Sequence, residues 1–272
     1  MRVLWLYAHP DPRSLNGSLR DHGISVLREH GHEVRESDLY AMDWDPVVRA
    51  SDFAHDPASR MDVLEESERA LNDGTLRADI RAEQEKLLWA DTLVVQFPLW
   101  WFGMPAILKG WFDRLFVQGF AQGVRDPATG RARRYGDGGL VGRRALVITT
   151  VGANAATTGP RGIHGELDEV LFPLTHGTLW YSGMTPVAPF VVNGAVSVSD
   201  DEYADAAKRL TERLLTLPDA DPIPFRHQNG GDYDSHLELR DDHAPGETGV
   251  GIHYTRDDVH CGRTGSDTEA QR

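Results

Sequence analysis

Residues 92–116 read TLVVQFPLWWFGMPAILKGWFDRLF, and this stretch decides the fold. It begins with Thr92–Phe97, a mostly apolar run that is typical of a strand buried on both faces of a sheet. From Met104 to Phe116, apolar residues then recur at the i, i+3, i+4 and i+7 spacing of an amphipathic helix. Because parallel sheets are built from strands followed by helices of this kind, the stretch predicts a βαβ unit.

The same alternation continues on both sides of this stretch. Before it, the predicted elements are a strand at 3–8, a helix at 15–27, a more polar strand at 32–39 and a helix at 77–89. After it, they are a strand at 145–150, a helical stretch at 165–181, a strand at 185–192 and a helix at 200–215. The series predicts an α/β, flavodoxin-like fold with a five-stranded, parallel, doubly wound sheet of order 2-1-3-4-5.

Two stretches exceed a minimal domain of this type. Residues 46–72 form a long acidic insertion after the second strand, and residues 218–272 form a tail rich in Gly, Asp and His. We therefore expect one folded domain over 1–217 and a C-terminal extension over 218–272. The extension has few large apolar groups, so it is either disordered or wraps a partner surface. Because residues 223–225 and 252–254 could anchor it, we expect it to wrap the partner up to about residue 255 and to be disordered beyond.

Composition excludes several classes of protein. The chain of 272 residues carries 42 acidic and 28 basic residues, a net charge of −14, which disfavours binding to nucleic acid or to an anionic membrane. The apolar run at residues 3–8 is too short for a signal peptide or a membrane span. A single cysteine, Cys261, cannot form an internal disulfide, which favours a reducing, cytoplasmic location.

Ligands of such folds bind at the carboxyl ends of the strands, so the loops that leave this edge are the candidate site. In the first loop, 9–17, Ser14 and Asn16 stand where a helix begins, and the exposed N–H groups there can bind an anion. His9 can add a donor. No Gly-x-Gly-x-x-Gly or P-loop motif is present, so phosphate binding and simple helix capping both remain open.

The second loop, 97–105, holds three consecutive aromatic residues, Trp100, Trp101 and Phe102. Consecutive side chains cannot all face one core, so at least one ring must face a cleft or solvent. A flat aromatic wall suits a planar heterocycle, although the rings could also merely close the end of the sheet.

The third loop, 149–165, is small, hydroxyl-rich and glycine-rich, so its backbone amides can approach a ligand closely. His164 closes this loop between two glycines and is either a catalytic or a structural residue.

With these loops the chain resembles the two-electron NAD(P)H:quinone oxidoreductases of the DT-diaphorase type, and most of all their bacterial members. The resemblance covers most of residues 1–190, in order and in spacing. It rests on the stretches AHPDPRSLN, HEVRESDLYAMDWDPV, AEQEKLLWADTLVVQFPLWWFGMPAILKGWFDRLF, ITTVG and RGIHGELDEVLFP. QFPLWWFGMPAILKGWFDR is the most specific of these.

The resemblance implies a flavin site with named residues. The pyrophosphate and ribityl portion of FAD would be held by His9, Ser14, Leu15 and Asn16. The isoalloxazine would be lined by Pro98, Leu99, Trp100, Trp101 and Phe102. The flavin N1–C2=O edge would face the amides of Thr149, Thr150, Val151 and Gly152. His164 would help to balance the charge of the reduced flavin, without the tyrosine that the family carries before this histidine.

The resemblance also implies an activity and a partner. NAD(P)H would give a hydride to flavin N5, and the flavin would pass it to a quinone or another small planar acceptor in a ping-pong reaction. We expect FAD in preference to FMN. We also expect a homodimer with active sites at its interface, because the helix at 104–117 has more apolar surface than one sheet face needs. Residues 121–140, which cover the substrate pocket in the family, diverge here.

Three alternatives remain open. A flavin-dependent azo- or nitroreductase would use the same first half-reaction. A non-catalytic flavodoxin-like regulator would bind flavin or nucleotide and act through its tail. The third, a metal site in the tail, is disfavoured because its histidines are spaced 7–10 residues apart, which matches no compact site, and no Cys-x-x-Cys is present. Those ligands would be His227, His236, His243, His253, His260 and Cys261.

Overall fold

The computed structural model describes residues 1–255, which form two compact units. The first is Met1–Pro222, and the second begins at Ile223. The expectation of disorder beyond residue 255, and the candidate ligands His260 and Cys261, lie outside the described residues.

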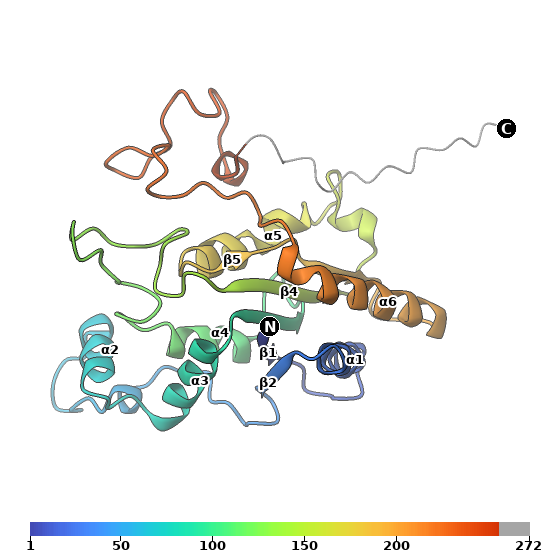
Figure 1. Ribbon diagram of the computed structural model, residues 1–272, viewed down its shortest axis with the longest axis horizontal. Coiled ribbons are helices and arrows are strands. Elements are labelled where there is room, and N and C mark those ends of the chain that lie inside the picture. Colours follow the sequence, from blue (N-terminus) through green and yellow to red (C-terminus); the bar gives the residue numbers. More distant parts are fainter. Residues whose placement is uncertain (256–272) are drawn as a thin grey trace. The chain divides into compact units, whose positions relative to one another are not determined.

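The first unit is built on one parallel sheet (Figure 1). Its strands run in the order β2-β1-β3-β4-β5, and β6 also pairs with β4, which confirms the predicted fold and strand order. Their bounds are Arg2–Tyr7 for β1, Glu33–Asp38 for β2, Thr92–Pro98 for β3, Arg144–Val151 for β4, Thr185–Pro186 for β5 and Phe190–Asn193 for β6. The three central strands β1, β3 and β4 are almost wholly buried, as their mostly apolar runs predict.

The fifth position of the sheet is shared by two short strands, where the sequence predicts one strand over 185–192. Val187 still donates its N–H to the Ala145 carbonyl of β4, at 3.0 Å. Pro189 has no N–H to give to the sheet, and the chain pairs again only from Phe190 onward. The interruption therefore follows from the missing donor of Pro189.

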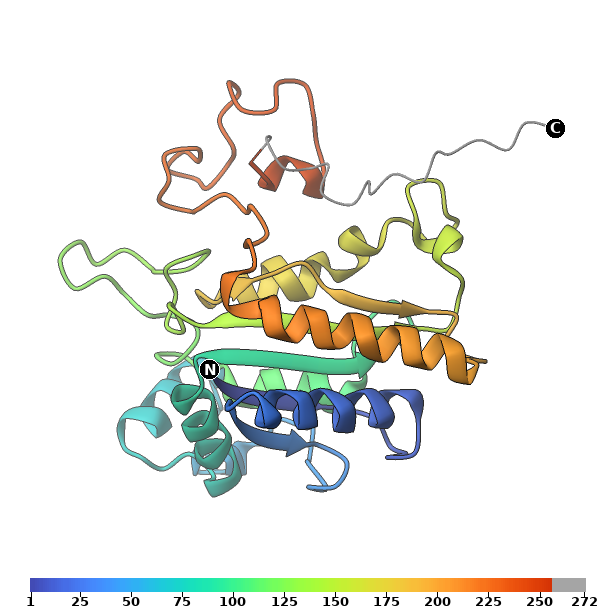
Figure 2. The ribbon, with the colours of Figure 1, turned by 45° about the vertical axis from the view of Figure 1, so that its right-hand side comes forward.

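Helices cover both faces of the sheet, as Figure 2 shows with α1 and α6 on the near face. α1 (Leu15–Glu29) and α6 (Asp200–Thr216) pack on the face that carries Trp5, Leu146 and Ile148. The opposite face is covered by α3 (Ala78–Trp89), α4 (Ala106–Leu115) and α5 (Leu167–Leu174). The remaining helical segments are η1 (Ala50–Phe53), α2 (Val63–Asn72), η2 (Ala155–Thr158), η3 (Thr175–Trp180), η4 (Leu217–Asp219) and η5 (Val250–His253).

The insertion after β2 packs on α4 through a buried ionic cluster that was not predicted from the sequence. Arg114 of α4 and Asp52 of η1 are both fully buried and pair at 2.9 Å. Asp79 accepts a second bond from Arg114 at 3.0 Å, and the guanidinium lies 4.4 Å from the centre of the Trp44 ring. We call Arg114, Asp52, Asp79 and Trp44 the Arg114 cluster.

The apolar face of α4 is inside the subunit, contrary to the expectation of a surplus on its surface. Trp111 and Leu115 are fully buried and Phe112 is nearly so, in one core with Trp44 and Phe53 of the segment that follows β2. This segment supplies the cover that a minimal domain would lack. The reason given for a dimer, an apolar surplus on this helix, is therefore wrong. This packing does not test whether the protein is a dimer.

The second unit has contacts of its own over 223–255. Phe225 and Tyr254 form an antiparallel bridge, and their rings lie 4.9 Å apart. Arg226 pairs with Asp232 at 2.6 Å, and Tyr233 bonds His253 at 2.9 Å. Over the residues that the structure describes, no helix has the length and apolar character needed to cross a membrane, and no cluster of three potential metal ligands occurs.

Candidate active site

A cavity of about 360 Å³ lies at the carboxyl ends of the central strands and is lined by all three predicted loops. Its volume is in the usual range of ligand sites, ~300–1,000 Å³. The lining residues are His9, Ser14, Leu15, Asn16, Pro98, Leu99, Trp100, Thr150, Gly152, Ala195 and Val196. We call it the edge cavity. Nine of these residues are among the predicted site residues.

Ala195 and Val196 line the cavity but were not predicted as site residues. They follow β6, which is parallel to β4, so their loop leaves the sheet at the same edge as the others. Only this strand order could have predicted them, since neither side chain has a polar or reactive group that would indicate a site.

The first loop makes a sharp turn into α1. The Ser14 hydroxyl accepts the N–H of Gly17 at 3.1 Å and caps the helix, as predicted for this position. A side chain on Gly17 would lie 1.8 Å from the Pro12 carbonyl oxygen, so only glycine fits this turn. The first turn of α1 holds no acidic residue, and the positive end of the helix dipole is thus not neutralised by the chain itself.

Hydrogen bonds join the three loops. Asn16 Nδ2 donates to Thr150 Oγ1 at 2.8 Å, and the Leu99 N–H donates to the Thr150 carbonyl at 2.9 Å. The other amide atom of Asn16, Oδ1, is buried and has no partner among the described residues. A buried acceptor without a donor is costly, so this atom marks a place where a ligand donor fits.

The aromatic loop forms a tight turn in which Trp100 and Gly103 exchange backbone hydrogen bonds at 3.0 and 3.1 Å. The two residues between them, Trp101 and Phe102, have φ of 51° and 61°, a left-handed conformation that bulky residues rarely adopt. Trp100, Trp101 and Phe102 are 42%, 97% and 54% exposed, which confirms that these rings do not all face the core. Of these three rings, only that of Trp100 lines the edge cavity.

Side chains of the third loop alternate, because β4 runs to Val151 and successive side chains of a strand point to opposite faces. Thr150 and Gly152 line the edge cavity, whereas the side chains of Thr149 and Val151 are buried outside it. The prediction for these four residues was that their backbone amides face the flavin. The positions of the side chains do not test it, so it stays a prediction.

His164 lies beside the aromatic loop rather than in the edge cavity. Its ring is half-buried, and its centre lies 5.4 Å from that of Phe102, edge to face. The backbone N–H of His164 donates to the Thr157 carbonyl at 3.0 Å. The structure therefore places His164 against Phe102 of the aromatic loop, and neither of these residues lines the edge cavity.

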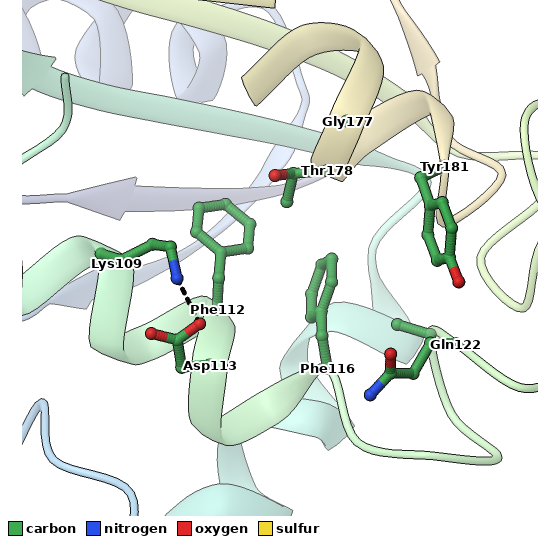
Figure 3. Close-up of a pocket in the computed structure, with 9 residues that line it drawn as sticks. Lys109, Phe112, Asp113, Phe116, Gln122, Gly177, Thr178 and Tyr181 are labelled. Carbon is green, nitrogen blue, oxygen red and sulfur yellow. Dashed lines mark hydrogen bonds and ion pairs between the residues drawn. The ribbon is translucent and has the colours of Figure 1, made fainter. Parts of the chain in front are cut away.

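A second cavity, of about 330 Å³, lies beside α4 and shares no lining residue with the edge cavity (Figure 3). In Figure 3 the rings of Phe112, on α4, and Phe116, directly after it, lie opposite Tyr181. Lys109 and Asp113 at its border pair with each other, so neither leaves an uncompensated charge. Gln122 of this cavity belongs to the divergent stretch 121–140.

Comparison with known proteins agrees with this architecture. The profile of a family described as having a flavodoxin-like fold matches residues 1–214. A ribosyldihydronicotinamide dehydrogenase-like protein of Penicillium crustosum is 41% identical over 95% of this chain and 97% of its own length. The rat NAD(P)H dehydrogenase [quinone] 1 is 34% identical over 82% of this chain and 80% of its own length.

A solved structure extends the likeness to three dimensions. A protein of Klebsiella pneumoniae, described as a candidate quinone reductase, is 48% identical and superposes with a TM-score of 0.90. The match covers 94% of this chain and all of the other. The chain belongs to the flavodoxin-like family and, within it, to the NAD(P)H:quinone oxidoreductases.

Proposed function

We propose that this protein transfers a hydride from NAD(P)H through a bound flavin to a quinone. The observation that carries the proposal is the edge cavity, where three loops of different chemistry meet: a helix N-terminus, an aromatic wall and a hydroxyl- and glycine-rich loop. Relatives named as quinone dehydrogenases support the same enzyme class.

The residues of the edge cavity fit a flavin. Asn16 Oδ1 lacks a donor, and Thr150 Oγ1 already accepts from Asn16, which leaves the Thr150 proton free to donate. One open acceptor beside one open donor suits hydroxyl groups such as those of a ribityl chain. The N-terminus of α1 suits phosphate, and Trp100 suits the face of a planar ring. We propose FAD rather than FMN, held by the residues named in the sequence.

The bound flavin would supply the hydride chemistry, and the chain supplies position and charge. The backbone amides of residues 149–152 would stabilise negative charge near the N1–C2=O edge of the reduced ring. His164, which packs against Phe102 of the aromatic loop, would help to balance that charge. NAD(P)H and the quinone would occupy the same cavity in turn, which implies ping-pong kinetics.

We further propose a homodimer with its active sites at the interface. Apolar side chains gather on the surface around the site: Trp101 is 97% exposed, Ile163 beside His164 is 90% exposed, and Val196 of the edge cavity is 85% exposed. Exposed apolar groups that gather in this way are typical of interfaces. The C-terminal extension would wrap the partner, and a single cysteine favours a cytoplasmic location.

The purified protein tests this function directly. We expect a flavin absorption spectrum, release of FAD on denaturation, bleaching by NADH or NADPH, and recovery of the colour on addition of a quinone. Released FMN would contradict the cofactor assignment. Faster reoxidation by azo dyes or nitroaromatics would favour the reductase alternative, and a spectrum that NAD(P)H does not bleach would favour a non-catalytic regulator. Light scattering at micromolar concentration measures the oligomeric state.

A further inference from the structure

Behind the edge cavity, a chain of buried hydrogen bonds crosses three strands of the sheet. Trp5 Nε1 of β1 donates to Gln96 Oε1 of β3 at 2.8 Å. Gln96 Nε2 donates to the Asn16 carbonyl in the first turn of α1 at 2.7 Å. Asn16 Nδ2 then donates to Thr150 Oγ1 of β4 at 2.8 Å. The chain therefore links the interior of the sheet to two residues that line the edge cavity.

The chemistry of the first member fixes the direction of all the others. An indole N–H can only donate, so Trp5 requires the oxygen of the Gln96 amide and turns its NH₂ group toward α1. That NH₂ group meets a backbone carbonyl, which can only accept. The orientation of the Gln96 amide is thus fixed by one group that can only donate and one that can only accept.

Besides this indirect link through Gln96, the ring of Trp5 packs directly against α1. A side chain on Gly23 would lie 2.5 Å from Cη2 of Trp5, so the helix lies against the indole where glycine leaves room. Trp5 thus holds α1 by packing at Gly23 and, through Gln96, by a hydrogen bond at its first turn. Both Trp5 and Gln96 are fully buried and neither lines the edge cavity.

We propose that Trp5 and Gln96 are positioning residues for the flavin site, an inference that rests on the proposed function. They hold the first turn of α1 at a fixed place relative to Thr150, so that the open Asn16 acceptor and the open Thr150 donor face the ligand together. A displacement of this turn would move the phosphate-binding N–H groups and the polar pair at the same time.

The test compares two glutamines with matched structural roles. Gln96→Met removes the chain of bonds at its centre. Gln84→Met is the control, because Gln84 is also buried and also donates Nε2 to a backbone carbonyl, that of Leu115 at 3.0 Å, but lies outside the edge cavity. Flavin is titrated into each flavin-free protein, and the dissociation constant and the spectrum of the bound flavin are measured together with thermal stability.

We expect Gln96→Met to raise the flavin dissociation constant about ten-fold and to alter the spectrum of the bound flavin. Gln84→Met should lose similar stability and keep flavin affinity within about two-fold of the unmodified protein. Trp5→Phe, a milder change that keeps most of the ring, should raise the constant about three-fold, and it carries the test if Gln96→Met does not fold.

Two failures are distinguishable. If the unmodified protein binds flavin and both Gln96→Met and Trp5→Phe bind it with unchanged affinity and spectrum, the positioning role is overturned and the proposed function stands. If the unmodified protein binds no flavin, the proposed function falls, and this inference falls with it.

Discussion

The edge cavity and the Arg114 cluster differ in which polar groups the chain satisfies by itself: in the cluster the charged groups are paired and the neutral Nε1 of Trp44 is the buried atom without a partner among the described residues. At the Arg114 cluster each charged group is paired: Arg114 meets Asp52 and Asp79 and also donates to the Asp45 carbonyl at 3.0 Å. At the edge cavity, by contrast, a buried acceptor lacks a donor, a tight turn carries two residues of positive φ, and aromatic rings face solvent.

The difference separates residues that maintain the fold from residues that serve a ligand. Departures from local rules are costly, at ~1–3 kcal/mol for each strained residue, and they gather where function requires them. The Arg114 cluster shows no such departure among its charges, so we assign it to stability. The two regions therefore respond to mutation in opposite ways, one in unfolding free energy and the other in ligand binding or rate.

The largest effect is expected at Arg114. Arg114→Met leaves buried Asp52 with a single, more distant counter-charge, Arg77 at 3.8 Å. Loss of one partner of a buried pair typically costs ~3–5 kcal/mol, and because Arg77 remains we expect the lower end of this range. Urea unfolding measures this loss. The control is Lys109→Gln on the same helix, whose exposed pair with Asp113 should contribute less than about 1 kcal/mol. A small loss at Arg114, or weaker flavin binding by the folded variant, would contradict the division between the two regions.

The next effect is expected at His164. His164→Ala should slow flavin reduction by NAD(P)H, because an imidazole that shares the charge of the reduced ring is lost. General acid–base groups contribute ~10²–10⁴-fold, and because backbone amides share the charge we expect about 10- to 100-fold. Stopped-flow absorbance measures the rate, and the flavin should stay bound. His30→Ala, at the far end of α1, is the control. An unchanged rate would show that His164 is structural.

Trp100 tests the aromatic wall. Trp100→Ala should weaken flavin binding about ten-fold, through loss of the ring that lines the edge cavity, and should leave the unfolding free energy nearly unchanged because the ring is 42% exposed. Leu88→Ala on α3 removes a similarly exposed apolar side chain away from the site and should change neither quantity. Equal flavin affinity in the two variants would remove Trp100 from the site.

Sequence was sufficient for the parts of the site that follow from chain direction. Parallel strands bring their carboxyl ends to one edge, so the order of strands and helices along the chain already places the loops at 9–17, 97–105 and 149–165 together. Ser14 could be predicted as a cap from its local position before the helix. Within the third loop, the alternation of β4 decides that Thr150 reaches the cavity and that the Thr149 side chain does not.

Contacts between distant segments could not be predicted. Arg114 and Asp52 are 62 residues apart, and the sequence around neither residue indicates that they pair. The apolar face of α4 indicates that something must cover Trp111 and Phe112, but periodicity does not say whether the cover is a second subunit or another part of the chain. Phe53 of the insertion, in the same core, provides part of that cover.

The smallest effect is expected within the insertion itself, as a dependence of stability on pH. Glu66 of α2 accepts a bond from Arg69 at 2.7 Å and pairs with His55 at 3.1 Å, and Arg69 also donates to the Phe53 carbonyl of η1. The bond from Arg69, followed by that from His55, holds the pKa of Glu66 below its ordinary value of 4.5.

Because the pKa of Glu66 is lower in the folded chain than in the unfolded chain, the unfolded chain binds more protons when the pH falls. The stabilisation by Glu66 is therefore fully present above the unfolded pKa and is lost as the pH falls through the folded value. Urea midpoints of the unmodified protein and of Glu66→Gln should differ at about pH 6 and converge by about pH 3. Glu68→Gln on the same helix is the control, since within the described residues Glu68 forms no ion pair. A difference that persists unchanged to about pH 3 would show that Glu66 acts by packing or by neutral hydrogen bonds, and not through its charge.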